Sequence, residues 1–403
     1  MRPDVAIVSP YPAPGRTHDG SSGVAAYTAN LARDLSFNGA NVVVVAPDEP
    51  TAPSSHRDGD VIVVSSGPRG PFALPRAVGI AADLRARVIH LQHEMFLFGG
   101  LSSIATLPMA VRSMRNHERG VVTTVHQVVD SELVSPEFLD VHRLRCPVGV
   151  ARLAINAYQC IVASIGPIIV HEAGFRKQFP NAVVIPHGVE DRMSPPRAEA
   201  RARLGLAGES RLVVLCFGFV APYKGLESAL AAAADVPDVL MVVAGGDHPR
   251  HGHEYADALQ SRWGERARFT GWLSEGEIAT WHAAADIALF YYPAPHSSSG
   301  AVAMALGYGT PVLASEALAR VMGLSPELAV SLDRVELAER LRRLAADRSS
   351  LAEMRQATAR MVAGRGWPEV ARRHLEIYER VASGTAGRAP LAIDSASDQL
   401  EAV

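Results

Sequence analysis

The sequence has few cysteines and no excess of charge of either sign. Its 403 residues include three cysteines, Cys146, Cys160 and Cys216, which lie far apart and form no paired metal-binding spacing. This pattern favours free, mostly buried thiols in a reducing cytoplasm over a disulfide framework. With 39 lysine and arginine residues against 42 aspartate and glutamate residues, the formal net charge is -3. We therefore expect no strongly basic surface for nucleic acid.

The chain also lacks the sequence features of secretory and membrane-spanning segments. Its first residues, MRPDVAIVSPYPAPG, have no basic flank followed by a long apolar core, so we expect no signal peptide. The most apolar long window, 148–170, contains Arg152, Asn156 and Gln159 and is interrupted by a Gly-Pro pair. Because a membrane-spanning helix needs about 20 mostly uncharged residues, this window is predicted to be a core helix followed by a strand.

Short apolar runs alternate with amphipathic helical patterns along most of the chain. The predicted strands are Val5–Ser9, Val42–Ala46, Val61–Ser65, Val88–Gln92, Val121–His126, Cys160–Ser164, Ala182–Pro186, Leu212–Phe217, Val239–Ala244, Ala267–Gly271, Ile287–Tyr291 and Pro311–Ala314. Continuous Val, Ile and Leu runs are typical of parallel strands that are covered on both faces. Amphipathic helices are predicted between them, for example over 23–38 and 224–234. The alternation predicts doubly wound α/β sheets.

The strand series pauses once, which predicts two domains. Polar residues, a Pro-Pro pair and a charged helical stretch occupy residues 191–210, where we place a linker. Residues 1–190 and 211–367 then form two Rossmann-like domains that face each other across a cleft, the usual place for a ligand. The small, polar residues 385–403 are predicted to be a disordered tail.

In the first half, candidate functional residues stand where strands end and helices begin. Gly23 lies in a polar glycine-containing loop before a helix, although the complete dinucleotide fingerprint G-x-G-x-x-G is missing. His93, Glu94 and His126 follow two different strands, whose carboxyl ends line the crevice of an open α/β sheet. A structural turn and half-buried imidazoles are the alternatives to a polar substrate pocket. No H-E-x-x-H or similar spacing supports a zinc site.

The second half contains two helix starts that suit an anion. Lys224 begins a helix, where the helix dipole disfavours a cation unless an anionic partner is present. Ser298, Ser299 and Gly300 precede another helix, and their hydroxyl and amide groups can bind phosphate oxygens. The polar loop 248–253, rich in histidine, is interpreted as solvent-exposed, with nucleotide or metal contact as the alternative.

Ordered motifs across almost the whole chain resemble those of the retaining nucleotide-sugar glycosyltransferases of family four, which have the GT-B fold. The similar stretches are SSGVAAYTANLARDL, NVVVVAP, LQHEMFLFGG, TVHQVV, VIPHGVE, FGFVAPYKGLE, VVAGG, FTGWLSEGEIATWHAAADIALF and GYGTPVLAS. The resemblance implies that a helix over 368–382 crosses back to pack on the first domain.

The resemblance also implies a role for each matching residue. Gly23 would lie beside the donor diphosphate, Lys224 would bind its phosphates, and His126 would lie beside the transferred sugar. His93 and Glu94, selected by their position at the end of a strand rather than by the resemblance, are predicted to contact the acceptor. The remaining donor-binding residues would be Ser298, Ser299, Gly300 and Ala301 at the distal phosphate, Trp272, Leu273 and Ser274 near the base, and His296 near the sugar.

Three positions depart from the family pattern. The family usually has an arginine where this chain has Phe219, and two glutamates where it has His296 and Met304. These changes affect residues that normally contact the donor ribose and the donor sugar. Because Lys224 and residues 298–300 are retained, we interpret the departures as altered donor specificity rather than lost activity.

The sequence therefore predicts a bacterial, cytoplasmic enzyme that transfers a sugar from a nucleotide diphosphate to an acceptor hydroxyl with retention of anomeric configuration. A UDP-sugar is the favoured donor, and no metal ion or other cofactor is expected. The acceptor is a small molecule or a glycan, and peripheral membrane contact stays open. The alternatives are a non-catalytic sugar-nucleotide-binding protein and a GT-B enzyme with another reaction, such as an epimerase or a cyclitol-coupling enzyme.

Overall fold

The chain divides into two compact units, each built around one sheet. The computed structural model describes residues 2–16, 23–48, 54–115, 120–141, 144–247, 253–295 and 297–384. Unit 1 comprises Met1–Ser135, Cys146–Pro186 and Trp367–Val403, and unit 2 comprises Pro136–Arg145 and His187–Gly366. The predicted tail, 385–403, lies outside the described residues.

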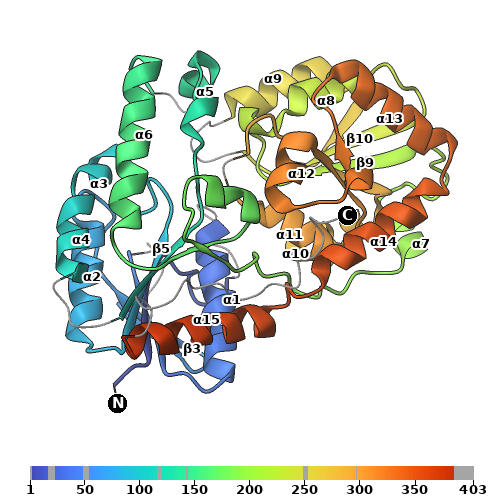
Figure 1. The fold of residues 1–403 in the computed structure, drawn as a ribbon. Helices are drawn as coiled ribbons and strands as arrows, with labels where there is room; N and C mark the ends of the chain where they lie inside the picture. The colour runs from blue at the N-terminus through green and yellow to red at the C-terminus, as the bar shows by residue number, and fades with distance from the viewer. Residues whose placement is uncertain are drawn as a thin grey trace, which may run out of the picture. The chain divides into compact units, whose positions relative to one another are not determined.

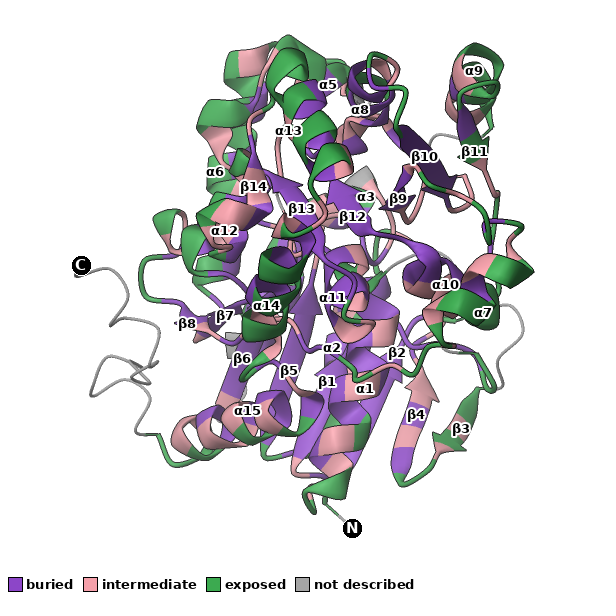
Figure 2. Cartoon of the chain, turned by 90° about the vertical axis from the view of Figure 1, so that its right-hand side faces the viewer, coloured by how far each residue is buried: buried purple, intermediate pink, exposed green. Residues whose placement is uncertain are grey.

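Unit 1 contains a predominantly parallel sheet. Its strands are β1 (Val5–Val8), β2 (Val42–Ala46), β3 (Ser55–Asp58), β4 (Val61–Ser65), β5 (Val88–His93), β6 (Gly120–Val125), β7 (Ile168–Val170) and β8 (Val183–Val184). They lie in the order β3-β4-β2-β1-β5-β6-β7-β8, and only β3 runs antiparallel to its neighbour. The central strands are almost wholly buried, whereas β3 is a more exposed edge strand (Figure 2).

Helices cover both faces of this sheet and bury their apolar sides against it. They are α1 (Gly23–Phe37), α2 (Ala73–Asp83), α3 (Leu101–Ala105), α4 (Leu107–Arg115), α6 (Val148–Ala163) and α15 (Trp367–Ala382). The last helix, α15, is far from α1 in sequence but packs beside it (Figure 1). Its buried stripe includes Trp367, Val370 and Ile377, which join the core of unit 1. The C-terminal helix is therefore part of the first domain.

Unit 2 contains a wholly parallel sheet with the strand order of the Rossmann fold. Its strands are β9 (Leu212–Phe217), β10 (Val239–Ala244), β11 (Ala267–Phe269), β12 (Ile287–Phe290), β13 (Val312–Ser315) and β14 (Ala329–Val330). They lie in the order β11-β10-β9-β12-β13-β14, which reverses direction between β9 and β12.

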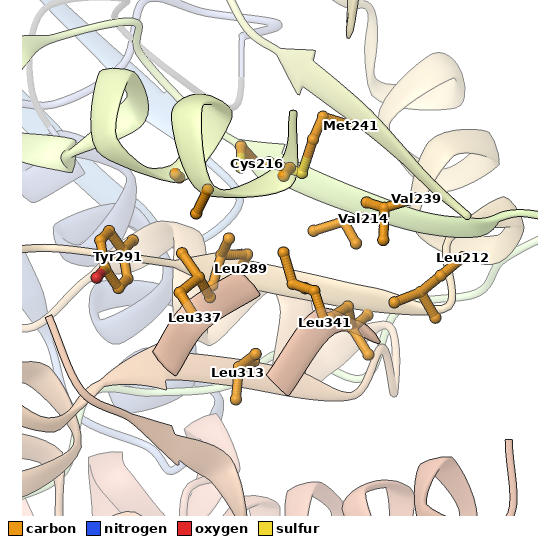
Figure 3. Packing of buried hydrophobic residues seen from close by; sticks show 14 of the residues in the cluster. Leu212, Val214, Cys216, Val239, Met241, Leu289, Tyr291, Leu313, Leu337 and Leu341 are labelled. Carbon is orange, nitrogen blue, oxygen red and sulfur yellow. The ribbon is translucent and has the colours of Figure 1, made fainter. Parts of the chain in front are cut away.

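Unit 2 also contains helices, most of which pack apolar residues against its sheet. They are α5 (Pro136–Val141), α7 (Arg197–Arg203), α8 (Leu226–Ala233), α9 (Glu254–Trp263), α10 (Glu275–Ala284), α11 (Gly300–Gly307), α12 (Glu316–Met322), α13 (Arg334–Ala346) and α14 (Ser350–Val362). Figure 3 shows Leu337 and Leu341 of α13 pointing toward Val214 and Leu289 of the sheet. The predicted class of two Rossmann-like α/β domains is confirmed.

The strand predicted over Cys160–Ser164 is wrong. Helix α6 continues to Ala163, and the strand of this region is β7, after the Gly-Pro pair that interrupts the helix. Helix α6, at the start of the apolar window 148–170, buries only one stripe of residues, and Leu153 is 72% exposed. The prediction of a core helix there is therefore wrong. The short strands β3 and β14 were not predicted, because neither forms a long apolar run.

The predicted linker, 191–210, contains helix α7 and belongs to unit 2. Arg197 and Arg201 project from this helix to the buried carboxylate of Asp286, at 2.5 and 3.0 Å. Arg348 pairs with the same carboxylate at 3.1 Å, and the backbone amide of Val213 donates to it at 2.8 Å. The charged helical stretch of the predicted linker is thus held to the sheet, because its arginines neutralise a buried acid.

Candidate functional site

The point where the strand order of unit 2 reverses is the natural place for a ligand. In open α/β sheets, ligands bind outside the carboxyl ends of the strands at such a point. Here β9 ends at Phe217 and β12 ends at Phe290. The segments that follow these two strands lead to Lys224 and to the start of α11, which are the two anion-binding elements predicted from the sequence.

Lys224 is buried beside β9, with 6% of its surface exposed. Its Nζ donates to the carbonyl oxygen of Phe217 at 3.1 Å and lies 5.6 Å from the centre of the Tyr292 ring. Within the described ranges, no carboxylate forms an ion pair with this ammonium group. Burial therefore lowers the pKa of Lys224 from its usual value of 10.5. The Lys224 ammonium group is removed from water and has no negative charge beside it among the described residues, so an anion bound next to it would be stabilised.

The chain contains only two lysines, although lysine and arginine together number 39. The other, Lys177, is largely exposed and binds Asp130 and Glu132, both at 2.7 Å. The two lysines thus differ in every respect that matters for ligand binding. Lys224 is the buried one, and its charge has no acidic partner in the part of the chain that the structure describes.

Two glycines allow the backbone to come close to Lys224. Gly218 has φ +104°, and a Cβ there would lie 2.5 Å from the Lys224 Nζ. Gly225 has φ +64°, and a Cβ there would lie 2.2 Å from the carbonyl oxygen of Tyr291. Any larger residue would be strained at both positions and would displace the Lys224 side chain or the segment that directly follows β12.

The start of α11 also approaches Gly218. Ser299 is the N-cap of this helix, and its Oγ accepts from the backbone amide of Val302 at 3.3 Å. The Tyr292 hydroxyl lies 3.3 Å from the same Oγ. The Ala301 Cβ would contact a Cβ at Gly218 at 3.4 Å, so the first turn of α11 and Lys224 meet there. The partial positive charge of a helix N-terminus and a buried ammonium group thus converge.

The other residues predicted around this helix are placed as follows. Gly300 begins α11, Ser298 precedes its N-cap, and Met304 lies one turn further along, half-buried. His296, predicted to contact the sugar, lies outside the described residues, as do residues 248–252 of the histidine-rich loop. Within the described ranges, no group of three His, Cys, Asp or Glu side chains is arranged to hold a metal ion.

An aromatic pair, exposed Trp272 and half-buried Phe219, borders the carboxyl ends of β9 and β11. Trp272 is 65% exposed, and its ring centre lies 6.1 Å from that of Phe219. The indole rests against Gly246, where a Cβ would lie 2.9 Å from the indole Cε3. Leu273 is part of the apolar core, and Ser274 uses both its hydroxyl and its amide in a capping box with Glu277. Of the three residues predicted near the base, Trp272 alone presents a large exposed side chain.

In unit 1, His126 follows β6 and lies in a buried polar network. Its Nε2 is 2.6 Å from Gln92 Oε1, and its Nδ1 is 3.2 Å from His171 Nε2. The Tyr27 ring packs edge-on against the imidazole at 4.8 Å between centres. Both ring nitrogens of His126 therefore have partners inside the protein. Gln92 and His171 were not predicted from the sequence. His171 also follows a strand, so the rule that selected His126 would have found His171 if β7 had been placed correctly.

Gly23, at the first position of α1, is exposed and has room for a Cβ. Tyr27 lies one turn further along the same helix, so the N-terminus of α1 is close to the ring that contacts His126. The preceding residues, 17–22, lie outside the described part of the chain. The structure thus brings Gly23 and His126 into one region of unit 1.

His93 ends β5 and forms a second polar group with α6. Its Nε2 hydrogen-bonds the hydroxyl of Tyr158, and its Nδ1 has no hydrogen-bond partner in the described part of the chain. Burial lowers the pKa of His93 to about 4, so the imidazole is neutral at pH 7. Burial, and secondarily the charge of Glu94, raises the pKa of Tyr158. His93 and Tyr158 thus form a neutral hydrogen-bonded pair, and the carboxylate of Glu94 lies near Tyr158.

Solved glycosyltransferases share the fold of this chain. Sucrose-phosphate synthase from Thermosynechococcus elongatus superposes with a TM-score of 0.76 at 20% identity, covering 94% of this chain and 99% of that one. Anabaena HepE in complex with UDP-glucose gives 0.64 at 17% identity, covering 95% and 99%. AviGT4, a glycosyltransferase involved in avilamycin A biosynthesis, gives 0.60 at 20% identity, covering 95% and 98%. At these identities the similarity establishes the fold.

Similarity in sequence is more limited. No family model matches the chain. A 2-deoxystreptamine glucosyltransferase from Streptomyces kanamyceticus is 32% identical over 198 residues. This match spans 44% of this chain and 48% of the relative, about half the length of each. No helix in the described ranges is both long enough and apolar enough to cross a membrane.

Proposed function

We propose that this protein is a retaining glycosyltransferase that moves a sugar from a nucleotide diphosphate, most favourably UDP, to an acceptor hydroxyl. The observation that carries the proposal is the meeting of buried Lys224 with the first turn of α11 at Gly218. The glucosyltransferase relative and the UDP and UDP-glucose complexes of HepE support this choice of donor class.

The chemistry requires stabilisation of a departing diphosphate. As the bond between the anomeric carbon and the phosphate oxygen breaks, negative charge grows on that oxygen. Lys224 and the N–H groups of α11 are fixed before the reaction, so they stabilise this charge without reorganising. These groups supply positive charge at the same place where a divalent cation would otherwise be needed, and we infer that the reaction is metal-independent.

We propose that the anomeric configuration is retained, because no residue is assigned as the general base that inversion would need. In the proposed route the acceptor oxygen attacks the face that the diphosphate leaves, and its proton passes to the departing phosphate oxygen. The new bond joins the anomeric carbon to the acceptor oxygen, and the nucleoside diphosphate leaves. His126 is not the base in this scheme, because its ring nitrogens are bonded to Gln92 and His171, and we propose that it orients the sugar.

The departures from the family pattern bear on the donor. Met304 offers no carboxylate to ribose hydroxyl groups, and Phe219 offers no second cation to the diphosphate. Phe219 instead forms an aromatic pair with Trp272. We propose that apolar and stacking contacts replace part of the usual polar recognition, so that the enzyme uses an altered donor. The same departures favour the second candidate, a sugar-nucleotide-binding protein without activity.

A donor panel separates the two candidates. UDP, GDP, ADP and dTDP sugars are tested first by thermal shift, because a ligand at 100 times its dissociation constant stabilises by about 2.7 kcal/mol. The donor that binds is then incubated with hydroxylated acceptors, among them 2-deoxystreptamine, and the released nucleoside diphosphate is measured. Release together with a glycosylated product supports the enzyme. Binding without release supports the non-catalytic protein, and absence of binding by every donor contradicts both.

A further inference from the structure

A chain of hydrogen bonds in unit 1 ends at a backbone carbonyl. His171, 1% exposed, lies at the end of β7. Its Nδ1 is 3.0 Å from the carbonyl oxygen of Ile185, and its Nε2 is 3.2 Å from His126 Nδ1. The Tyr27 ring packs against both imidazoles, at 4.9 Å from His171 and 4.8 Å from His126. Trp367 of α15 packs behind Tyr27 at 5.1 Å.

The carbonyl group of Ile185 determines which ring nitrogens of His171 and His126 carry a proton. A carbonyl oxygen only accepts, so His171 Nδ1 must carry a proton. A neutral imidazole has one N–H, which leaves His171 Nε2 as an acceptor. His126 Nδ1 must then donate to it, and His126 Nε2 carries no proton. Burial of both rings favours their neutral forms over charged ones.

The structure places Gln92 Oε1 beside His126 Nε2 and the Gln92 amide nitrogen 3.3 Å from His90 Nε2, so this proton arrangement requires the Gln92 amide to be turned over. The amide oxygen, which only accepts hydrogen bonds, lies 2.6 Å from His126 Nε2. The two ends of an amide have the same shape, so the hydrogen-bond network decides which end faces the ring. An unprotonated Nε2 requires the amide NH₂ at this position.

We propose that His171 is a positioning residue that holds His126 in the tautomer with its proton on Nδ1. Through Nε2, His126 can therefore only accept a hydrogen bond, from Gln92 or from a hydroxyl group of a ligand. This inference rests on the proposed function only for its kinetic consequence, since the tautomer is a property of the protein alone. In the transfer reaction, a sugar hydroxyl would donate to His126.

The tautomer is measured directly by long-range ¹H–¹⁵N NMR on the full chain with ¹⁵N-labelled histidine, without ligand. The His126 signals are assigned from the spectrum of His126→Gln. We expect a protonated Nδ1 and an unprotonated Nε2 in the wild type. A proton on Nε2 alone, or on both nitrogens, would overturn the proposal.

Substitution of His171 tests whether this residue sets the tautomer. His171→Asn places an amide where Nδ1 was, which keeps the bond to Ile185 but removes the acceptor for His126. We expect His126 to populate both tautomers in this variant, and turnover to fall by at least about 10-fold, the lower range for losing a group that orients another. An unchanged His126 tautomer in folded His171→Asn would contradict the role.

His374→Asn is the matched control. His374 is a fully buried histidine of the same unit, whose Nδ1 bonds the Val370 carbonyl within α15. We expect His126 to keep its tautomer in this variant. If His374→Asn gave the same tautomer mixture as His171→Asn, loosening of the core would explain both results and the proposal would be refuted. If the wild type shows the expected tautomer but transfers no sugar, the proposed function fails while the positioning role stands.

Discussion

Replacing Lys224 by methionine should weaken catalysis and stabilise the free protein. Methionine keeps the apolar length of the side chain but removes the charge. The ammonium group is buried, bonds the Phe217 carbonyl at 3.1 Å and has no acidic partner within the described ranges. Loss of one fixed donor to a developing oxyanion typically costs about 100-fold or more, which corresponds to about 2.7 kcal/mol. We therefore expect turnover of the nucleotide sugar to fall by at least about 100-fold.

The effect on stability has the opposite sign. Burial lowers the pKa of Lys224 below 10.5, so at neutral pH the folded state carries a cost for the charge that the unfolded state does not. Removing the charge should raise the free energy of unfolding measured with urea in the absence of ligand. Lys177→Met is the matched control, because it removes the same charge from an exposed side chain and should leave turnover unchanged. Near-normal turnover in folded Lys224→Met, or an equal loss in Lys177→Met, would refute the reasoning.

Three further outcomes are expected. Burial lowers the pKa of His93 and His374 to about 4 and that of His282 to about 3, so the unfolded chain binds more protons than the folded chain below pH 6.5. The free energy of unfolding should fall as the pH drops from 6.5 to 4, by up to about 1.4 kcal/mol per pH unit for each histidine, and a flat urea-unfolding profile would contradict this. Transfer should survive a strong chelator, whereas complete loss that added metal restores would show a required ion. Proton NMR of the new linkage should show an α-linked product from an α-linked donor, and a large axial–axial coupling at the anomeric centre of a gluco-configured product would show inversion.

The sheets could be predicted because their strands are continuous apolar runs. Residues 42–46 and 239–244 are almost wholly buried, and such runs have few alternatives in an α/β chain. The prediction failed where apolar residues have another use. Residues 160–163 continue helix α6, and the edge strand β3 alternates exposed and half-buried residues. Local composition does not distinguish these cases, because β3 forms by pairing with the neighbouring strand β4 and residues 160–163 extend the helix that precedes them.

The candidate site could be predicted only in part, for a related reason. Ser299 is the N-cap of α11, and Lys224, predicted to begin a helix, ends a 3-10 turn just before Gly225, the N-cap of α8; both places leave a local signal. Tyr292, which lies between them, has no such signal, because its position depends on the neighbouring strands β9 and β12. His171 depends in the same way on the pairing of β6 with β7. Side chains that support a site from an adjacent strand become visible only when the register is known.

The claim that Lys224 binds the donor diphosphate can be tested by NMR of protein labelled with ¹³C- and ¹⁵N-lysine. The chain has two lysines, so the spectrum contains two side-chain ammonium groups, and Lys177 serves as the internal reference. A nucleoside diphosphate at saturating concentration should shift the ε signals of Lys224 and raise its pKa, because the bound anion replaces the missing partner. The Lys177 signals should stay in place. Lys224 signals that remain unmoved with UDP, GDP, ADP and dTDP would contradict the account.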